Sequence, residues 1–118
     1  MAGVALQRNG FAVIENVLND KECEAMRKGM WDHAERLMRD NGGLCRDDPT
    51  TYANVFKLYP NHGMLHQHHQ WGVCQAAFDV RQNPKVIREF EKFWGTQKLT
   101  SSIDGVETLQ QHTLSCCS

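Results

Sequence analysis

Four histidines stand close together in the middle of the chain, and their imidazoles are the side chains best suited here to bind a transition metal. They are His62, His66, His68 and His69, within the run HGMLHQHHQ. In an extended segment, side chains two residues apart point to the same side, so His66 and His68 would face together. With the carboxylate of Asp79, they would form the two-histidine, one-carboxylate set that binds Fe(II) on one face of an octahedron.

A second interpretation of the same segment is a solvated or substrate-facing loop, and the sequence favours it over a native metal site. Asp79 lies on a different segment from the histidines, and the run itself is rich in glutamine and histidine. Closely spaced imidazoles also bind nickel, copper or zinc adventitiously. We therefore expect no native metal ligands. The alternative is a metal site formed by His66, His68 and Asp79.

The sequence suggests roles for two further polar residues, Arg81 and Asp104. The Arg81 guanidinium could form a bidentate contact with a carboxylate. The sequence favours a structural role for it, either in an ion pair with a nearby acid or on the loop before Asn83. Asp104 precedes Gly105 and is first a turn residue. No phosphate-binding glycine loop and no nucleophile elbow occurs in the sequence.

The first element that could position these residues is a helix that begins after Asn19. Asn19 and Glu22 have the spacing of a capping box, in which each side chain binds the other residue's backbone N–H. Gly42-Gly43 is expected to end the helix. One face is apolar, because the following residues recur at three- and four-residue steps: Cys23, Met26, Met30, Ala34, Leu37 and Met38.

The second predicted helix has the clearest limits in the sequence. Asn83 is its cap, Pro84 takes the first position, where no N–H is needed, and Gly95 ends it. Its apolar residues are expected to form a buried stripe, so that Phe90→Ala would cost about 3–5 kcal/mol. The residues of this stripe are Val86, Ile87, Phe90, Phe93 and Trp94.

Short strands are expected on both sides of these helices. Phe11-Ala12-Val13-Ile14 is an apolar run of strand length after Gly10, and Leu99–Ile103 is a second candidate. Residues 44–62 show no period and are expected to form a surface connection or a lid. Four residues could anchor that connection to the core: Tyr52, Phe56, Leu58 and Tyr59.

Composition limits the class of protein. The 118 residues suffice for one domain with a modest core. The formal net charge is −1 and the pI is near 6.6, so no broad basic field indicates nucleic acid or an anionic membrane. The sequence lacks a membrane-spanning apolar stretch and a secretory signal. An odd count of 5 cysteines without a CxxC pair indicates reduced thiols. We expect a cytoplasmic protein that binds neither nucleic acid nor membrane.

Three motifs in the second half of the chain together resemble a known enzyme family. They are Asp79-Val80-Arg81-Gln82-Asn83-Pro84-Lys85-Val86, Phe93-Trp94-Gly95-Thr96 and Ser102-Ile103-Asp104-Gly105. With them, the chain from about Gly10 to Val106 resembles the N-terminal part of the phytanoyl-CoA dioxygenase-like proteins. These form a branch of the Fe(II)- and 2-oxoglutarate-dependent oxygenases.

The resemblance implies a fold and a chemistry. The family builds its site on a jelly roll, or double-stranded β-helix. We therefore expect an α+β fold, with two main helices and a few short strands that form the N-terminal portion of an incomplete roll. In full-length relatives, a His-x-Asp pair and a distant histidine hold Fe(II), which hydroxylates an organic substrate with 2-oxoglutarate and dioxygen. Residues 107–118 contain no His-x-Asp.

Three functions follow as hypotheses. The leading one is a truncated phytanoyl-CoA dioxygenase-like protein, inactive alone and binding no cofactor, with a domain at 1–106 and a divergent, unstructured tail at 107–118. The second is a non-catalytic binding or regulatory fragment, whose exposed edge strand near Leu99–Ile103 would pair with a second copy or a full-length homologue. The third is a divergent metal-dependent oxygenase that uses His66 and His68.

Overall fold

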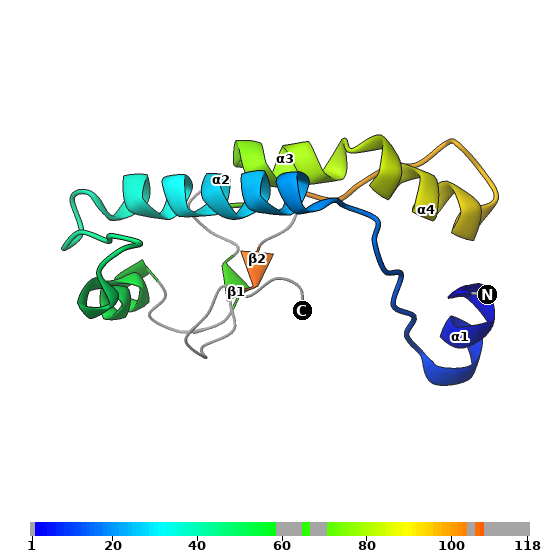
Figure 1. The fold of residues 1–118 in the computed structure, drawn as a ribbon, viewed down its shortest axis with the longest axis horizontal. Helices are drawn as coiled ribbons and strands as arrows, with labels where there is room; N and C mark the ends of the chain where they lie inside the picture. The colour runs from blue at the N-terminus through cyan, green and yellow to red at the C-terminus, as the bar shows by residue number, and fades with distance from the viewer. Residues whose placement is uncertain (1, 59–64, 67–70, 104–105, 108–118) are drawn as a thin grey trace.

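Helices make up most of the structure, a computed structural model that describes residues 2–58, 65–66, 71–103 and 106–107 (Figure 1). In chain order the elements are α1 (Ala2–Asn9), α2 (Asp20–Met38), the 3₁₀ helix η1 (Pro49–Leu58), β1 (Leu65–His66), the 3₁₀ helix η2 (Trp71–Val73), α3 (Gln75–Arg81), α4 (Pro84–Trp94) and β2 (Val106–Glu107). Among these residues, no helix is both long enough and apolar enough to cross a membrane.

The predicted α+β fold, with part of a jelly roll, is wrong. The β pairing in the described residues is one short antiparallel contact, in which Leu65 pairs with Glu107 and His66 with Val106. Phe11–Ile14 and Leu99–Ile103, the two expected strands, have no strand structure. An apolar run becomes a strand only where a neighbouring strand takes up its backbone hydrogen bonds. Neither run has such a neighbour within the described chain.

The predicted capping box at the start of α2 is confirmed. The Glu22 backbone N–H donates to Asn19 Oδ1 at 2.9 Å, and the Asn19 backbone N–H donates to Glu22 Oε2 at 2.7 Å. The helix ends close to the predicted glycines, where the Gly43 N–H donates to the Met38 carbonyl at 2.9 Å. Gly43 has a φ of 74°, a left-handed conformation that favours glycine.

The core lies where α2 meets η2 and α3. Ala34, Met38, Leu44 and Trp71 form one buried cluster, while Cys74, Ala76 and Ala77 form another, and Met30 packs against both. Small residues let the two helices approach closely, because a Cβ placed on Gly29 would lie only 2.8 Å from Ala76 Cβ. Figure 1 shows α2 and α3 side by side as a result.

One polar side chain, His33, is buried in this core. Its ring meets Trp71 edge-on, with 4.7 Å between the ring centroids. Arg36 Nη2 lies 2.8 Å from His33 Nδ1. Since a guanidinium can only donate, Nδ1 accepts this hydrogen bond. The buried histidine is therefore both packed against Trp71 and hydrogen-bonded to Arg36.

The limits of α4 are confirmed, but its predicted burial is wrong. Asn83 Oδ1 accepts from the Lys85 backbone N–H at 2.9 Å, and Gly95 ends the helix with a φ of 66°. No residue of α4 is buried. Phe90 is 55% exposed, Phe93 45% and Trp94 65%. The amphipathic pattern identified the apolar face correctly. Val86 and Ile87, at its N-terminal end, are half-buried, whereas Phe90, Phe93 and Trp94 remain exposed.

The connection after α2 contains a 3₁₀ helix, η1, where the sequence suggested a loop or lid. The Tyr52 hydroxyl donates to the Arg46 carbonyl at 2.7 Å, and Tyr52 and Val55 pack against the core. Asn54 Nδ2 donates to the carbonyls of Gly42 and Gly43, both at 3.0 Å. Tyr52 is thus an anchor, as predicted. Tyr59 and the side chains of Phe56 and Leu58 lie outside the described part.

Candidate binding surface

The structure describes only part of the predicted metal site. His66 belongs to β1, while His62, His68 and His69 lie outside the described residues. Asp79 lies on α3, where its exposed carboxylate accepts a hydrogen bond from Gln75 Nε2 at 2.7 Å. This contact is a local one within a single helix. The proposed set of His66, His68 and Asp79 is therefore not assembled in the part of the chain that is described.

The described residues do not fit the facial iron site of the resembled family. Nowhere in residues 2–58, 65–66, 71–103 and 106–107 do three or more His, Cys, Asp or Glu side chains gather to hold a metal ion. Arg81, for which the sequence allowed a carboxylate contact but favoured a structural role, donates from Nη1 to the Gly72 carbonyl and so joins α3 to η2. This contact gives Arg81 a structural role. Asp104 lies outside the described residues.

The apolar residues of α4 form one face of the helix, which we call the α4 stripe and which is exposed in its C-terminal half. The stripe consists of Val86, Ile87, Phe90, Phe93 and Trp94. At its C-terminal end, the rings of Phe93 and Trp94 pack edge to face, with centroids 4.8 Å apart and planes at 80°. The stripe therefore ends in a preformed aromatic pair that is open to solvent.

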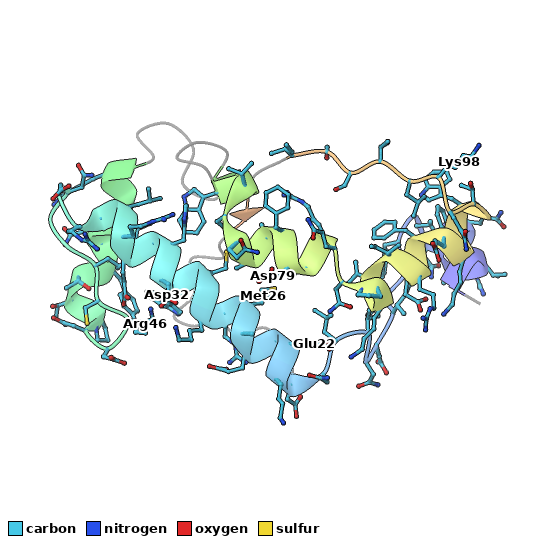
Figure 2. All side chains as sticks on the ribbon, turned by 90° about the horizontal axis from the view of Figure 1, so that it is seen from above. Glu22, Met26, Asp32, Arg46, Asp79 and Lys98 are labelled. Atoms are coloured by element: carbon cyan, nitrogen blue, oxygen red, sulfur yellow. The ribbon has the colours of Figure 1, made fainter. Side chains whose placement is uncertain are left out.

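Glu22 fixes the position of α4 relative to α2. Its Oε2 accepts from Lys85 Nζ at 2.7 Å, and its Oε1 accepts from Asn83 Nδ2 at 3.0 Å. The hydrogen bond from Lys85, followed by those from the Asn19 backbone and Asn83, lowers the pKa of Glu22 from 4.5 to about 2. Figure 2 shows Glu22 at the junction between the two helices. The helix cap of α2 thus also holds the first turn of α4.

Charged residues are arranged in a definite order around α4. Glu89 and Glu91 lie directly before and after Phe90 in the sequence, and both side chains are half-buried. Lys92 Nζ pairs with Glu89 Oε1 at 2.6 Å, and Lys85 is held by Glu22. Arg88 is exposed on the side of the helix away from the stripe. The stripe is therefore bordered by glutamates, with basic side chains behind them.

A second charged cluster, at the other end of α2, is structural. Arg46 contacts both Asp32 and Glu35, and its Nη2 lies 2.7 Å from Glu35 Oε2 (Figure 2). The Arg46 contacts lower the pKa of Glu35, and contacts from Lys28 first and Arg46 second lower that of Asp32. Both carboxyls in turn raise the pKa of Arg46. These contacts join α2 to the segment before η1, and so account for all three ionised groups.

Sequence reasoning assigned the α4 stripe to the core and so missed the exposure of its aromatic residues. A signal was present: between Gly95 and Ile103 the chain is mainly polar, with Leu99 and Ile103 as its large apolar residues. That segment could not have covered all five apolar side chains, and Phe90, Phe93 and Trp94 remain exposed. Ile103 is itself 69% exposed.

Comparison with protein-family models, with curated proteins and with solved structures gave no match.

Proposed function

We propose that this chain is a non-catalytic protein-binding module, distantly related to the phytanoyl-CoA dioxygenase-like proteins, that binds its partner through the α4 stripe. The observation that carries the proposal is the exposure of Phe90, Phe93 and Trp94 on one capped helix. The relationship to the family is supported by the three motifs, two of which overlap α4.

Energetics favour a covered stripe. Burying apolar surface contributes roughly 25 cal/mol per Å², and a large side chain left in water forgoes that contribution. Tryptophan and other aromatic residues also dominate the binding energy of protein interfaces, where they act as central anchors. An edge-to-face pair such as Phe93 and Trp94 can enter a partner's pocket with little loss of rotamer freedom.

The absence of catalysis can be tested directly. The sequence has no His-x-Asp at any position, so two of the three iron ligands used by the family have no obvious donor. We expect the chain to form no succinate from 2-oxoglutarate when Fe(II), ascorbate and dioxygen are supplied. Succinate formation that depends on Fe(II) and is abolished by His66→Ala and His68→Ala would contradict the proposal and favour a divergent oxygenase.

Protein binding through the stripe requires a site-specific test. Phe90 is replaced by the photo-crosslinker p-benzoylphenylalanine, and Arg88, on the opposite side of α4, is replaced in the same way as a matched control. We expect a defined crosslinked partner from position 90 that position 88 does not give. The captured protein is then purified and its affinity for the chain measured by calorimetry.

With the purified partner, the anchoring role of the aromatic pair becomes measurable. Trp94→Ala should weaken binding by about tenfold or more, as expected for a central aromatic anchor, whereas Arg88→Ala should leave it unchanged. Equal crosslinking from positions 88 and 90, or an affinity that Trp94→Ala does not alter, would exclude the stripe as the binding surface.

A further inference from the structure

We infer that the partner of the α4 stripe is a protein with an apolar groove bordered by lysine or arginine side chains. This inference rests on the proposed function and adds the charge of the partner surface. The geometry that leads to it is the position of the acidic side chains around the helix.

Both borders of the stripe carry a glutamate. Successive residues of an α-helix are about 100° apart around its axis, so Glu89 and Glu91 lie on opposite sides of Phe90. The two carboxylates therefore flank the widest part of the apolar face. A groove that receives this face would place its own two rims against them.

The basic residues of α4 offset the charge on one side of this acidic border only. Lys85 is held at the helix N-terminus by Glu22, at 2.7 Å. Lys92 pairs with Glu89 at 2.6 Å, and Arg88 lies behind the stripe. Glu91 forms no ion pair with any residue that the structure describes. Carboxylates that border an apolar helix face select partners with positive rims, because like charges across an interface are unfavourable.

The same arrangement opposes a second copy of this chain as the occupant. Two α4 helices packed stripe to stripe would bring a glutamate border against a glutamate border in either orientation, since both borders carry one at the same level. Such juxtaposed like charges disfavour pairing. A basic-rimmed groove brings opposite charges together instead, and an amphipathic helix of three turns is a common ligand for such a groove.

The test uses two designed helical hairpins that share one leucine-lined groove and differ only at its rims, which carry either lysines or glutamates. Each labelled hairpin is titrated with the full chain, and binding is followed by fluorescence anisotropy. We expect the lysine-rimmed hairpin to bind about tenfold more tightly at low salt, with the difference shrinking as salt screens the rim contacts.

Substitution of the two border glutamates of α4 tests whether they cause this preference. Glu89→Lys with Glu91→Lys should reverse the preference, and Glu89→Gln with Glu91→Gln should abolish it without reversal, while circular dichroism checks that the helix persists. Glu24→Gln, on exposed α2 surface, serves as the control and should leave the preference intact.

The outcomes separate this inference from the proposed function. Equal binding of both hairpins that Trp94→Ala abolishes would overturn the charge selection and leave stripe docking standing. Binding of neither hairpin, or binding that Trp94→Ala does not weaken, would overturn stripe docking itself. A dimer of the chain in sedimentation that Trp94→Ala dissociates would overturn the inference in favour of a second copy.

Discussion

Glu22 shows how one side chain can serve two elements. As the third residue of α2 it completes the capping box with Asn19, and its carboxylate also binds Lys85 and Asn83 at the start of α4. The capping box could be predicted from spacing alone, because cap and helix lie within four residues. The contact with Lys85 spans most of the chain, and no local pattern in the sequence indicates it.

The pH dependence of stability should report this contact. The pKa of Glu22 falls from 4.5 to about 2 on folding, so its stabilising contribution is complete above pH 4.5 and is lost as the pH falls towards 2. We expect Glu22→Gln to be less stable than the wild type near pH 7, and the two chains to converge near pH 2. Urea unfolding at a series of pH values measures this.

Glu24→Gln provides the matched control for that experiment. Glu24 is also on the first turns of α2, but its exposed side chain only pairs with Arg27 at 3.0 Å. Its substitution should leave the pH profile almost unchanged, because exposed pairs contribute little. A Glu22→Gln profile parallel to that of the wild type down to pH 2 would show that the carboxylate does not hold α4.

At the level of elements, the packing of α2 on α3 depends on the absence of a side chain at Gly29. A Cβ there would lie 2.8 Å from Ala76 Cβ, inside van der Waals contact, so the helices would have to move apart. Overpacking costs about 1–3 kcal/mol, and a Gly-to-Ala change inside a helix offsets about 1 kcal/mol of it. We expect Gly29→Ala to lower the free energy of unfolding by up to about 2 kcal/mol.

Two further variants show whether that loss arises from the helix contact. Gly3→Ala, where nothing lies within 4 Å of the new Cβ, should be neutral or slightly stabilising. Combining Gly29→Ala with Ala76→Gly should recover stability relative to the sum of the single changes, since the added methyl takes the space of the deleted one. Strict additivity in denaturant unfolding would mean that the two helices do not touch there.

Because α4 is exposed, substitutions in its apolar stripe should lower the free energy of unfolding less than its sequence predicts. Since Phe90 is 55% exposed, Phe90→Ala should cost below about 1 kcal/mol, well short of the 3–5 kcal/mol expected of a buried stripe. Met38 is fully buried on α2, and Met38→Ala should cost about 2–5 kcal/mol. Thermal and urea unfolding of the two variants compare them. A larger loss of unfolding free energy for Phe90→Ala than for Met38→Ala would show that the stripe is buried after all.

These elements also show what the sequence could and could not predict. The start of α2 and both limits of α4 were predicted correctly, because Asn19, Asn83 and Gly95 act through local backbone hydrogen bonds, whereas α2 ends at Met38, before the predicted glycines. The two strand predictions were wrong, because an apolar run such as Phe11–Ile14 forms a strand only when a distant segment pairs with it, and a local pattern does not show whether one does. The burial of α4 was wrong for a related reason: periodicity identifies the apolar face but does not say whether another element covers it. Among the site residues, Arg81 contacts Gly72, a pairing that spacing did not indicate.

For the whole molecule, the surface is large for the chain's size. The chain exposes 9276 Å², whereas a compact monomer of this mass exposes about 6,500 Å². Its Cα radius of gyration is 16.2 Å, against about 13.5 Å for a compact domain of this length. Among the described elements, Figures 1 and 2 show that α4 and α1 extend beyond the N-terminal end of α2, away from the packed α2–α3 pair, which adds to this surface. Such a molecule has a small core and much surface for a partner.

Hydrogen exchange should therefore differ sharply along the chain. Amides of α2 from Trp31 to Met38 lie against the buried cluster and should exchange most slowly, because they open only with the core. Amides of α1 should exchange fastest among the helices, since α1 has eight residues and its Val4 is 69% exposed. Those of α4 should be intermediate, held by the Glu22 contact and the helix caps.

A bound partner should change this exchange pattern in one element only. Addition of the lysine-rimmed hairpin should slow exchange in α4 while leaving Trp31 to Met38 unchanged, because binding to the stripe stabilises that helix without altering the core. Exchange–mass spectrometry with and without the hairpin measures both. If α4 in the isolated chain already exchanged as slowly as α2, at every protein concentration, the chain itself would be covering the stripe, and the surface proposed for binding would not be available.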